Sequence, residues 1–186
     1  AALYVPTPFA RPGEPAHPAQ VAQLAGDAAA HLSGRTMVLT TTLRALQAIA
    51  DQLRAELAAV GSDIRVLQQG EAPKRALMAL FLAEPRSVLV GSQSFWEGID
   101  VPGDALQCVL IDKLPFPPPN DPVVAARIAQ AEKNGGKPFM DYFIAEAAVS
   151  LKQGAGRLIR SETDRGLLVV CDPRMAGMMP STKGSL

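Results

Sequence analysis

The sequence lacks the short motifs that identify several common classes of enzyme. It has no G-x-x-x-x-G-K-[ST] segment, the loop that cradles phosphates in P-loop enzymes. It has no G-x-S-x-G turn to expose a nucleophilic serine, and no acidic Mg²⁺-binding segment stands out. Gly154 and Gly156 form a G-x-G pair, but they fall in or after an expected helix and not directly after a strand. These absences argue against a complete P-loop, serine-nucleophile or dinucleotide-binding site in this chain.

Residues that bind metals or form disulfides are scarce. The two cysteines, Cys108 and Cys171, lie inside apolar runs and are expected to be buried as small hydrophobic side chains. His17 and His31 are isolated, so no group of residues has the spacing of a metal site. We therefore expect neither a metal ligand nor a disulfide framework in this chain.

Neither charge nor hydrophobicity is concentrated in one part of the chain. Eighteen basic and eighteen acidic residues give a formal net charge of zero, so any nucleic acid must bind to a local patch. No apolar run approaches the roughly 18 residues of a membrane span. The N-terminus also lacks the charged and apolar regions of a signal peptide. We expect a cytoplasmic protein with no membrane partner.

Short apolar runs alternate with amphipathic segments along the 186 residues. The runs predict strands over residues 37–39, 64–67, 87–90, 106–112 and 167–171. The amphipathic segments predict helices over residues 19–32, 43–60, 74–82, 123–133 and 139–159. This alternation predicts one α/β domain over residues 19–180, with a mostly parallel sheet and helices on both faces. Residues 1–18 are proline-rich and predict an extended lead-in, and residues 181–186 form a tail.

Polar and glycine-rich segments directly follow the predicted strands. In an open parallel sheet, ligands bind beyond the carboxyl ends of the strands. The segments expected to gather at that edge are residues 40–42, 68–70, 91–103, 112–120 and 172–174.

An arginine-containing helix forms the first candidate site. In a helix, Gln153, Gly156, Arg157 and Arg160 occur at i, i+3, i+4 and i+7 and share one face. Two guanidinium groups beside a glycine suit an anion that approaches the backbone closely and spreads its charge over several oxygens. The alternative is an ordinary solvated arginine face on an amphipathic helix.

The loop after the third predicted strand contains a second candidate site. Glu97, Gly98 and Asp100 place two carboxylates around a glycine, and a carboxylate can accept a hydrogen bond from a ribose hydroxyl. The hydroxyls of Ser92 and Ser94 can bind a phosphate there. The alternative is a structural loop with capping acids. We expect this loop and the arginine helix to lie at the same edge of the sheet.

These segments resemble motifs of superfamily 2 helicases. Residues 91–103 look like motif V, residues 38–41 like motif IV, and Gln153-x-x-Gly156-Arg157-x-x-Arg160 like motif VI. More narrowly, E-G-I-D at 97–100, K-L-P-F at 113–116 and L-K-Q-G-x-G-R-L-I-R at 151–160 resemble the DinG/YoaA branch, the bacterial relatives of XPD-type 5′→3′ DNA helicases. The resemblance covers about residues 2–175. Ala145 departs from it, because a proline is expected there.

The resemblance implies a RecA-like, three-layer α/β/α domain that lacks the P-loop and is the second of two motor domains. The N-terminal RecA-like domain of the same protein would be its partner and would bind Mg²⁺ and most of the ATP. That first half would also hold any iron–sulfur cluster, with none in this chain. We therefore expect the chain to be the C-terminal part of a larger protein.

In this family ATP binds between the two motor domains, which implies roles for the residues of the arginine helix. Arg157 and Arg160 would be arginine fingers that stabilise charge on the γ-phosphoryl group. Gln153 would sense that phosphate, and Gly156 would let the two backbones approach. The loop residues expected at the nucleotide are Glu97, Gly98 and Asp100.

The resemblance also implies single-stranded or forked DNA as a partner, in DNA repair or replication. The strand would cross the top of both domains and be held mainly through its backbone. The candidate contacts on this chain are Thr40, Thr41, Ser92, Gln93 and Ser94. Trp96 could stack on a base or anchor its loop.

Two other functions remain open at this point. One is the motor half of a DinG-like exonuclease that depends on ATP and nucleic acid. The other is a non-catalytic RecA-like module that binds nucleic acid or a partner, and the presence of Arg157 and Arg160 argues against it. In the helicase interpretation we expect the chain alone to hydrolyse no ATP and to bind single strands weakly at best.

Overall fold

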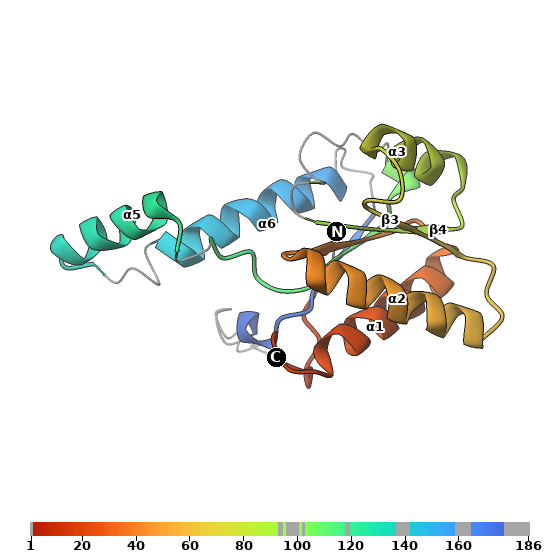
Figure 1. Ribbon diagram of the computed structural model, residues 1–186, viewed down its shortest axis with the longest axis horizontal. Coiled ribbons are helices and arrows are strands. Elements are labelled where there is room, and N and C mark those ends of the chain that lie inside the picture. Colours follow the sequence, from red (N-terminus) through yellow and green to blue (C-terminus); the bar gives the residue numbers. More distant parts are fainter. Residues whose placement is uncertain are drawn as a thin grey trace, which may run out of the picture. The chain divides into compact units, whose positions relative to one another are not determined.

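The computed structural model describes residues 2–92, 95, 101, 103–117, 120–136, 142–158 and 165–176, except for the side chains of residues 153–157. The chain forms two compact units (Figure 1). The larger consists of residues 1–113 and 157–186, and the smaller of residues 114–156. The sequence predicts one domain over residues 19–180, whereas the structure divides that range between both units.

The larger unit is built on a parallel β-sheet. Among the described residues the sheet has six strands in the order β1-β6-β5-β2-β4-β3, and each neighbouring pair is parallel. The strands are β1 (Ala2–Tyr4), β2 (Thr36–Thr40), β3 (Arg65–Gln68), β4 (Ser87–Ser92), β5 (Cys108–Ile111) and β6 (Leu167–Val170). The predicted α/β class with a parallel sheet is confirmed.

The strand β1 is the one that the sequence pattern does not predict. It lies in the segment expected to be an extended lead-in, and it pairs with β6, with Leu3 opposite Leu168. All three of its residues are exposed, so they do not form the apolar run that marks a strand buried on both faces. The sheet therefore begins, at its edge, within the proline-rich segment.

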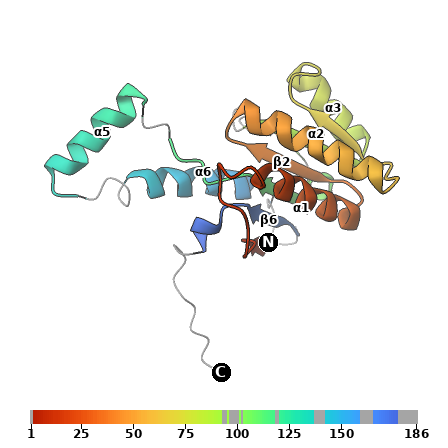
Figure 2. The same cartoon turned by 60° about the horizontal axis from the view of Figure 1, so that its bottom comes forward.

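Alternate residues of the strands face two different helical layers. The helices of the larger unit are α1 (His17–Leu32), α2 (Leu43–Ala59) and α3 (Lys74–Ala83). Val38 and Leu110 belong to an apolar core that also contains residues of α1 and α2, and these two helices lie side by side (Figure 2). Met37 and Val109 alternate with them and are also buried. Figure 1 shows α3 on the side of the sheet opposite to α1 and α2, which gives three layers.

Local sequence features set the boundaries of these helices. Thr42 caps α2, because its hydroxyl oxygen accepts a hydrogen bond from the Ala45 N–H at 3.2 Å. After α1, Gly34 adopts a left-handed conformation with φ of 92° and lies against the backbone of Pro85 and Ser87. The chain can therefore turn from α1 into β2 only through a residue without a side chain.

The smaller unit contains α5 (Pro122–Lys133) and most of α6 (Ile144–Leu158). Asp121 caps α5 as predicted, because its Oδ1 accepts two N–H groups of the first turn at 2.8 and 3.2 Å. The Arg127 guanidinium lies 5.6 Å from the centre of the Tyr142 ring, and one of its nitrogens lies 3.4 Å from Glu146 Oε1. These contacts link α5 to the beginning of α6.

The two cysteines, Cys108 and Cys171, are buried and unpaired, as predicted. In the described part of the chain, no helix combines the length and the apolar composition that crossing a membrane requires.

Candidate functional site

Side-chain hydrogen bonds connect the carboxyl ends of neighbouring strands in the larger unit. Asp112, after β5, accepts the Thr41 N–H at 3.1 Å through Oδ1. Gln69, after β3, accepts the Ser92 N–H at 2.6 Å through Oε1. The predicted gathering of polar segments at this edge is therefore confirmed for the described residues after β2, β3, β4 and β5.

The two threonines expected to contact DNA differ in their surroundings. Thr40 is buried, and its hydroxyl donates to the Thr42 carbonyl at 3.1 Å, with Gly91 O a longer 3.5 Å away. The Thr41 Oγ1 is also buried but has no hydrogen-bond partner among the described residues. The Thr40 hydroxyl is thus bonded to the backbone after β2. Of the two threonines, Thr41 is the one whose hydroxyl has no partner among the described residues.

Asp112 has an unusual protonation equilibrium for a carboxyl group. Its side chain is 1% exposed, and this burial raises its pKa from 3.8 to about 7. The Lys113 charge and the N–H groups of Lys113 and Thr41 oppose the shift, whereas the nearby Asp172 charge adds to it. The sequence places Asp112 at this edge but does not reveal how deeply it is buried.

The raised pKa of Asp112 predicts a specific pH dependence of stability. The native state binds the proton at a pH where the unfolded state has lost it, so stability falls as the pH rises from about 4 to about 7. At about 1.4 kcal/mol per pKa unit, the contribution is on the order of 4 kcal/mol. Asp112→Asn cannot titrate and retains an oxygen acceptor, so it should flatten this slope in urea unfolding measured across that range.

Asp63→Asn is the matched control for this experiment. Asp63 is exposed, and its hydrogen bond from Arg86 lowers the carboxyl pKa below the ordinary value of 3.8. Its contribution to stability is therefore lost only as the pH falls below that value. A wild-type slope in Asp112→Asn would contradict the assignment of the slope to Asp112.

An ion pair beyond β6 also belongs to the carboxyl edge. Asp172 is fully buried, and its carboxylate accepts hydrogen bonds from Arg174 Nε at 2.8 Å and Nη2 at 2.5 Å. The hydrogen bonds that Arg174 donates to Asp172 raise the pKa of Arg174. Residues 172–174 were expected at this edge, but the sequence alone did not predict this two-point contact. The pair fixes an arginine side chain where the sheet ends.

Only part of the arginine helix lies within the described residues. Gln153, Gly156 and Arg157 lie in α6, as predicted, and their spacing places their backbone positions on one face. Several expected site residues lie outside the described residues, namely Gln93, Ser94, Trp96, Glu97, Gly98, Asp100 and Arg160.

The end of α6 is fixed by a close contact in the larger unit. Leu158 is buried, and a Cβ added to Gly166 would lie 2.4 Å from its Cγ. Gly166 directly precedes β6, and its carbonyl accepts the Ala2 N–H at 2.9 Å. Arg157 is thus next to a residue that packs closely on the beginning of β6.

The contact also places the end of α6 relative to the sheet. Gly166 directly precedes β6, so Leu158 lies near the amino end of that strand. Thr41 and Ser92 lie at the carboxyl ends of β2 and β4. The sequence predicts that the arginine helix and the loop after β4 share one edge; residues 96–100 and Arg160 lie outside the described residues, so this stays a prediction.

Among the described residues, no group of three or more His, Cys, Asp or Glu side chains could hold a metal ion. The described residues therefore do not fit a Mg²⁺ or iron–sulfur site of their own.

Residues 26–183 match a protein family described as the helicase C-terminal domain. Over 142 residues the chain is 47% identical to ATP-dependent DNA helicase YoaA of Haemophilus influenzae, covering 76% of this chain and 21% of that protein. Over 144 residues it is 37% identical to a Bacillus subtilis protein named 3′-5′ exonuclease DinG, covering 76% of this chain and 15% of that one.

The solved structure of S. tokodaii Xpd4 is similar with a TM-score of 0.68 and 16% sequence identity, over 94% of this chain and 34% of that one. This likeness shows the fold, which is that of a RecA-like helicase domain. The chain spans about a fifth of the length of YoaA. On the match over residues 26–183 and the similarity to YoaA and DinG proteins, the chain belongs to the family of helicase C-terminal domains.

Proposed function

We propose that this chain is the second motor domain of an ATP-dependent DNA helicase that moves 5′→3′ in DNA repair or replication. The observation that carries the proposal is the close packing of Leu158 on Gly166, because it fixes the end of the helix that contains Gln153, Gly156 and Arg157. A catalytic side chain is most effective on an element whose position is already set. Family membership and the absence of a P-loop support the same function.

In this proposal the chain completes an ATP site that a partner domain begins. Arg157 and Arg160 act as arginine fingers, and Gln153 senses the γ-phosphate. Gly156 permits close approach of the two backbones, and Glu97, Gly98 and Asp100 lie at the ribose or adenine. Mg²⁺ neutralises phosphate charge when bound, and the partner domain supplies its ligands, as it would those of any iron–sulfur cluster.

Single-stranded DNA crosses the carboxyl edge in the same proposal. Thr41 supports this role, because its buried hydroxyl has no hydrogen-bond partner among the described residues. Ser92 lies at the same edge, where its N–H is bonded to Gln69. Thr40, Gln93 and Ser94 complete the proposed track. A phosphodiester held by hydroxyl and amide groups gives binding without sequence preference.

A second candidate function is the motor half of an exonuclease. It is favoured by the similarity to the Bacillus subtilis protein named 3′-5′ exonuclease DinG, of which this chain covers 15%. In that case the same arginines would couple ATP hydrolysis to movement along a strand that another domain degrades. A non-catalytic binding module and a cytoplasmic location remain predictions.

The proposal predicts that the purified 186-residue chain hydrolyses no ATP, with or without single-stranded DNA. The physical reason is that arginine fingers stabilise charge on a phosphate that a P-loop must hold. The measurement is phosphate release, compared with a longer protein that joins this chain to its P-loop domain. Turnover by the chain alone would refute the shared site.

A further inference from the structure

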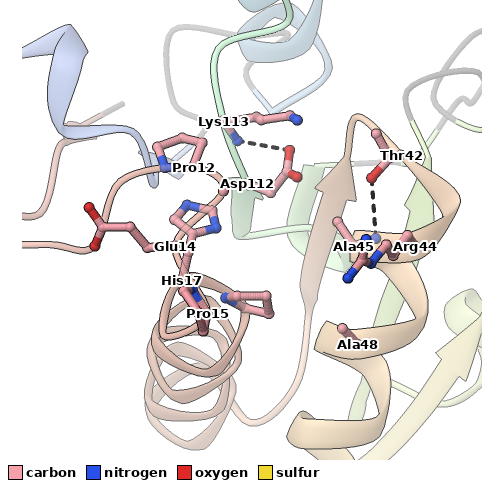
Figure 3. A pocket seen from close by; sticks show the side chains of 12 residues that line it. Pro12, Glu14, Pro15, His17, Thr42, Arg44, Ala45, Ala48, Asp112 and Lys113 are labelled. Atoms are coloured by element: carbon pink, nitrogen blue, oxygen red, sulfur yellow. Dashed lines mark hydrogen bonds between the residues drawn. The ribbon is translucent and has the colours of Figure 1, made fainter.

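A cavity of about 420 Å³ opens at the carboxyl edge of the sheet, beside the first turns of α1 and α2 (Figure 3). It is lined by the proline-rich segment, by α2 and by the residues that follow β5. Its volume lies in the range of about 300–1,000 Å³ typical of small-molecule sites. None of the residues expected to contact ATP or DNA lines it.

Two positively charged side chains line this cavity from different elements. Arg44 lies in the first turn of α2, and Lys113 follows β5. In the described part of the chain neither side chain forms an ion pair. Among the described residues, the arginines that do pair with a carboxylate are Arg54, Arg65, Arg86, Arg127 and Arg174. Two cations that form no ion pair within the described part of the chain favour an anion near them.

Two carboxyl groups, those of Glu14 and Asp112, also line the cavity, and a charged carboxylate would repel a bound anion. Figure 3 shows the Glu14 carboxylate directed away from Arg44, on the far side of His17. The Asp112 Oδ1 already accepts two backbone N–H groups. Burial raises the pKa of Asp112 to about 7, so its negative charge is reduced near neutral pH. Neither acid forms an ion pair with Arg44 or Lys113.

The remaining walls of the cavity are apolar and rigid. Pro12 and Pro15 precede α1, and Ala45 and Ala48 belong to α2. Proline rings and methyl groups can pack against a sugar or a base while a phosphate contacts the cations. The partial positive charge at the beginning of α2 acts in the same direction.

We propose that this cavity binds one nucleotide unit, with its phosphate on Arg44 and Lys113 and its sugar against Pro12 and Ala45. The unit can belong to a DNA strand at this edge or be a free mononucleotide, because the phosphate chemistry is the same. The DNA source rests on the proposed helicase function, whereas the mononucleotide source does not.

The experiment is a titration of the isotope-labelled chain with a short oligothymidylate and, separately, with deoxythymidine monophosphate, followed by NMR. The backbone amides of Thr42 and Ala45 should shift with each ligand that occupies the cavity. Arg44→Gln and Lys113→Gln should each weaken binding about tenfold at low salt, as expected for a lost charge-assisted contact. Each should also reduce the slope of log K against log salt by about 0.7 for the oligonucleotide.

Arg75→Gln is the matched control, because Arg75 is exposed on α3 and does not line the cavity. If the oligonucleotide binds, and Arg44→Gln, Lys113→Gln and Arg75→Gln weaken its binding equally, the cavity proposal is wrong and the helicase proposal stands. If only the mononucleotide binds, and Arg44→Gln weakens its binding while Arg75→Gln does not, the cavity proposal holds and the proposed DNA track fails. Binding of neither ligand would overturn the cavity proposal.

Discussion

Replacing Arg157 with alanine in the longer protein that contains this chain should lower ATP turnover by about 10³–10⁵-fold. The γ-phosphoryl group gains charge on its outer oxygens in the transition state, and a guanidinium stabilises that charge more than it stabilises bound ATP. Turnover should therefore fall while nucleotide affinity changes little. The measurements are steady-state ATPase with saturating single-stranded DNA and fluorescence binding of a nucleotide analogue.

Two further variants make the Arg157 experiment specific. Arg157→Lys retains the charge but loses the planar fork, so it should remain strongly impaired if bidentate contact matters. Lys152→Ala removes an exposed cation from the same helix and should leave turnover close to wild type. Unchanged turnover in Arg157→Ala, or an equal loss in Lys152→Ala, would refute the arginine-finger role.

A large loss of stability is expected from a substitution at Gly34, which joins α1 to β2. An added Cβ would lie 2.2 Å from the Pro85 carbonyl oxygen and 2.5 Å from the Ser87 nitrogen. These are backbone atoms of the segment that enters β4, and the Arg35 N–H also bonds to the Pro85 carbonyl. They cannot move without disturbing the centre of the sheet. Gly34→Ala should therefore lower the free energy of unfolding by at least about 3 kcal/mol.

Gly61→Ala separates steric overlap from backbone strain in this prediction. Gly61 also has a positive φ, of 64°, but a Cβ added there meets nothing within 4 Å. It should cost only about 1 kcal/mol, from the left-handed conformation alone. Urea unfolding of both variants and the wild type provides the comparison. Equal losses at the two glycines would show that the contact with Pro85 and Ser87 is not the cause.

The central strands could be predicted from sequence because their residues are buried on both faces. Met37, Val38 and Leu39 form an unbroken apolar run, which predicts a buried strand, and in the structure they lie in β2. β1 could not be predicted, because its exposed residues depend on pairing with β6 more than 160 positions later. Strands stabilised by distant partners leave little local pattern.

The candidate site was only partly predictable, for a related reason. The types of residue at the carboxyl edge follow from the order of strands and loops, so Thr41 and Ser92 were placed correctly. The packing of Leu158 on Gly166 depends on how closely two backbones approach, which residue spacing does not encode. The same is true of the burial of Asp112 and of the cavity beside Arg44.

The contact between Leu158 and Gly166 has a mechanical consequence under the proposed function. It ties the arginine-bearing end of α6 to the amino edge of the sheet, whereas the proposed DNA contacts lie at the carboxyl edge. A strand such as β2, with five residues, spans about 16.5 Å at about 3.3 Å per residue. Hydrogen-bonded parallel strands do not shorten, so a force applied at the arginines reaches the DNA as a tilt of the whole sheet. The larger unit then moves as a rigid body, and the length of its strands sets the distance between the arginines at the ATP site and the DNA contacts.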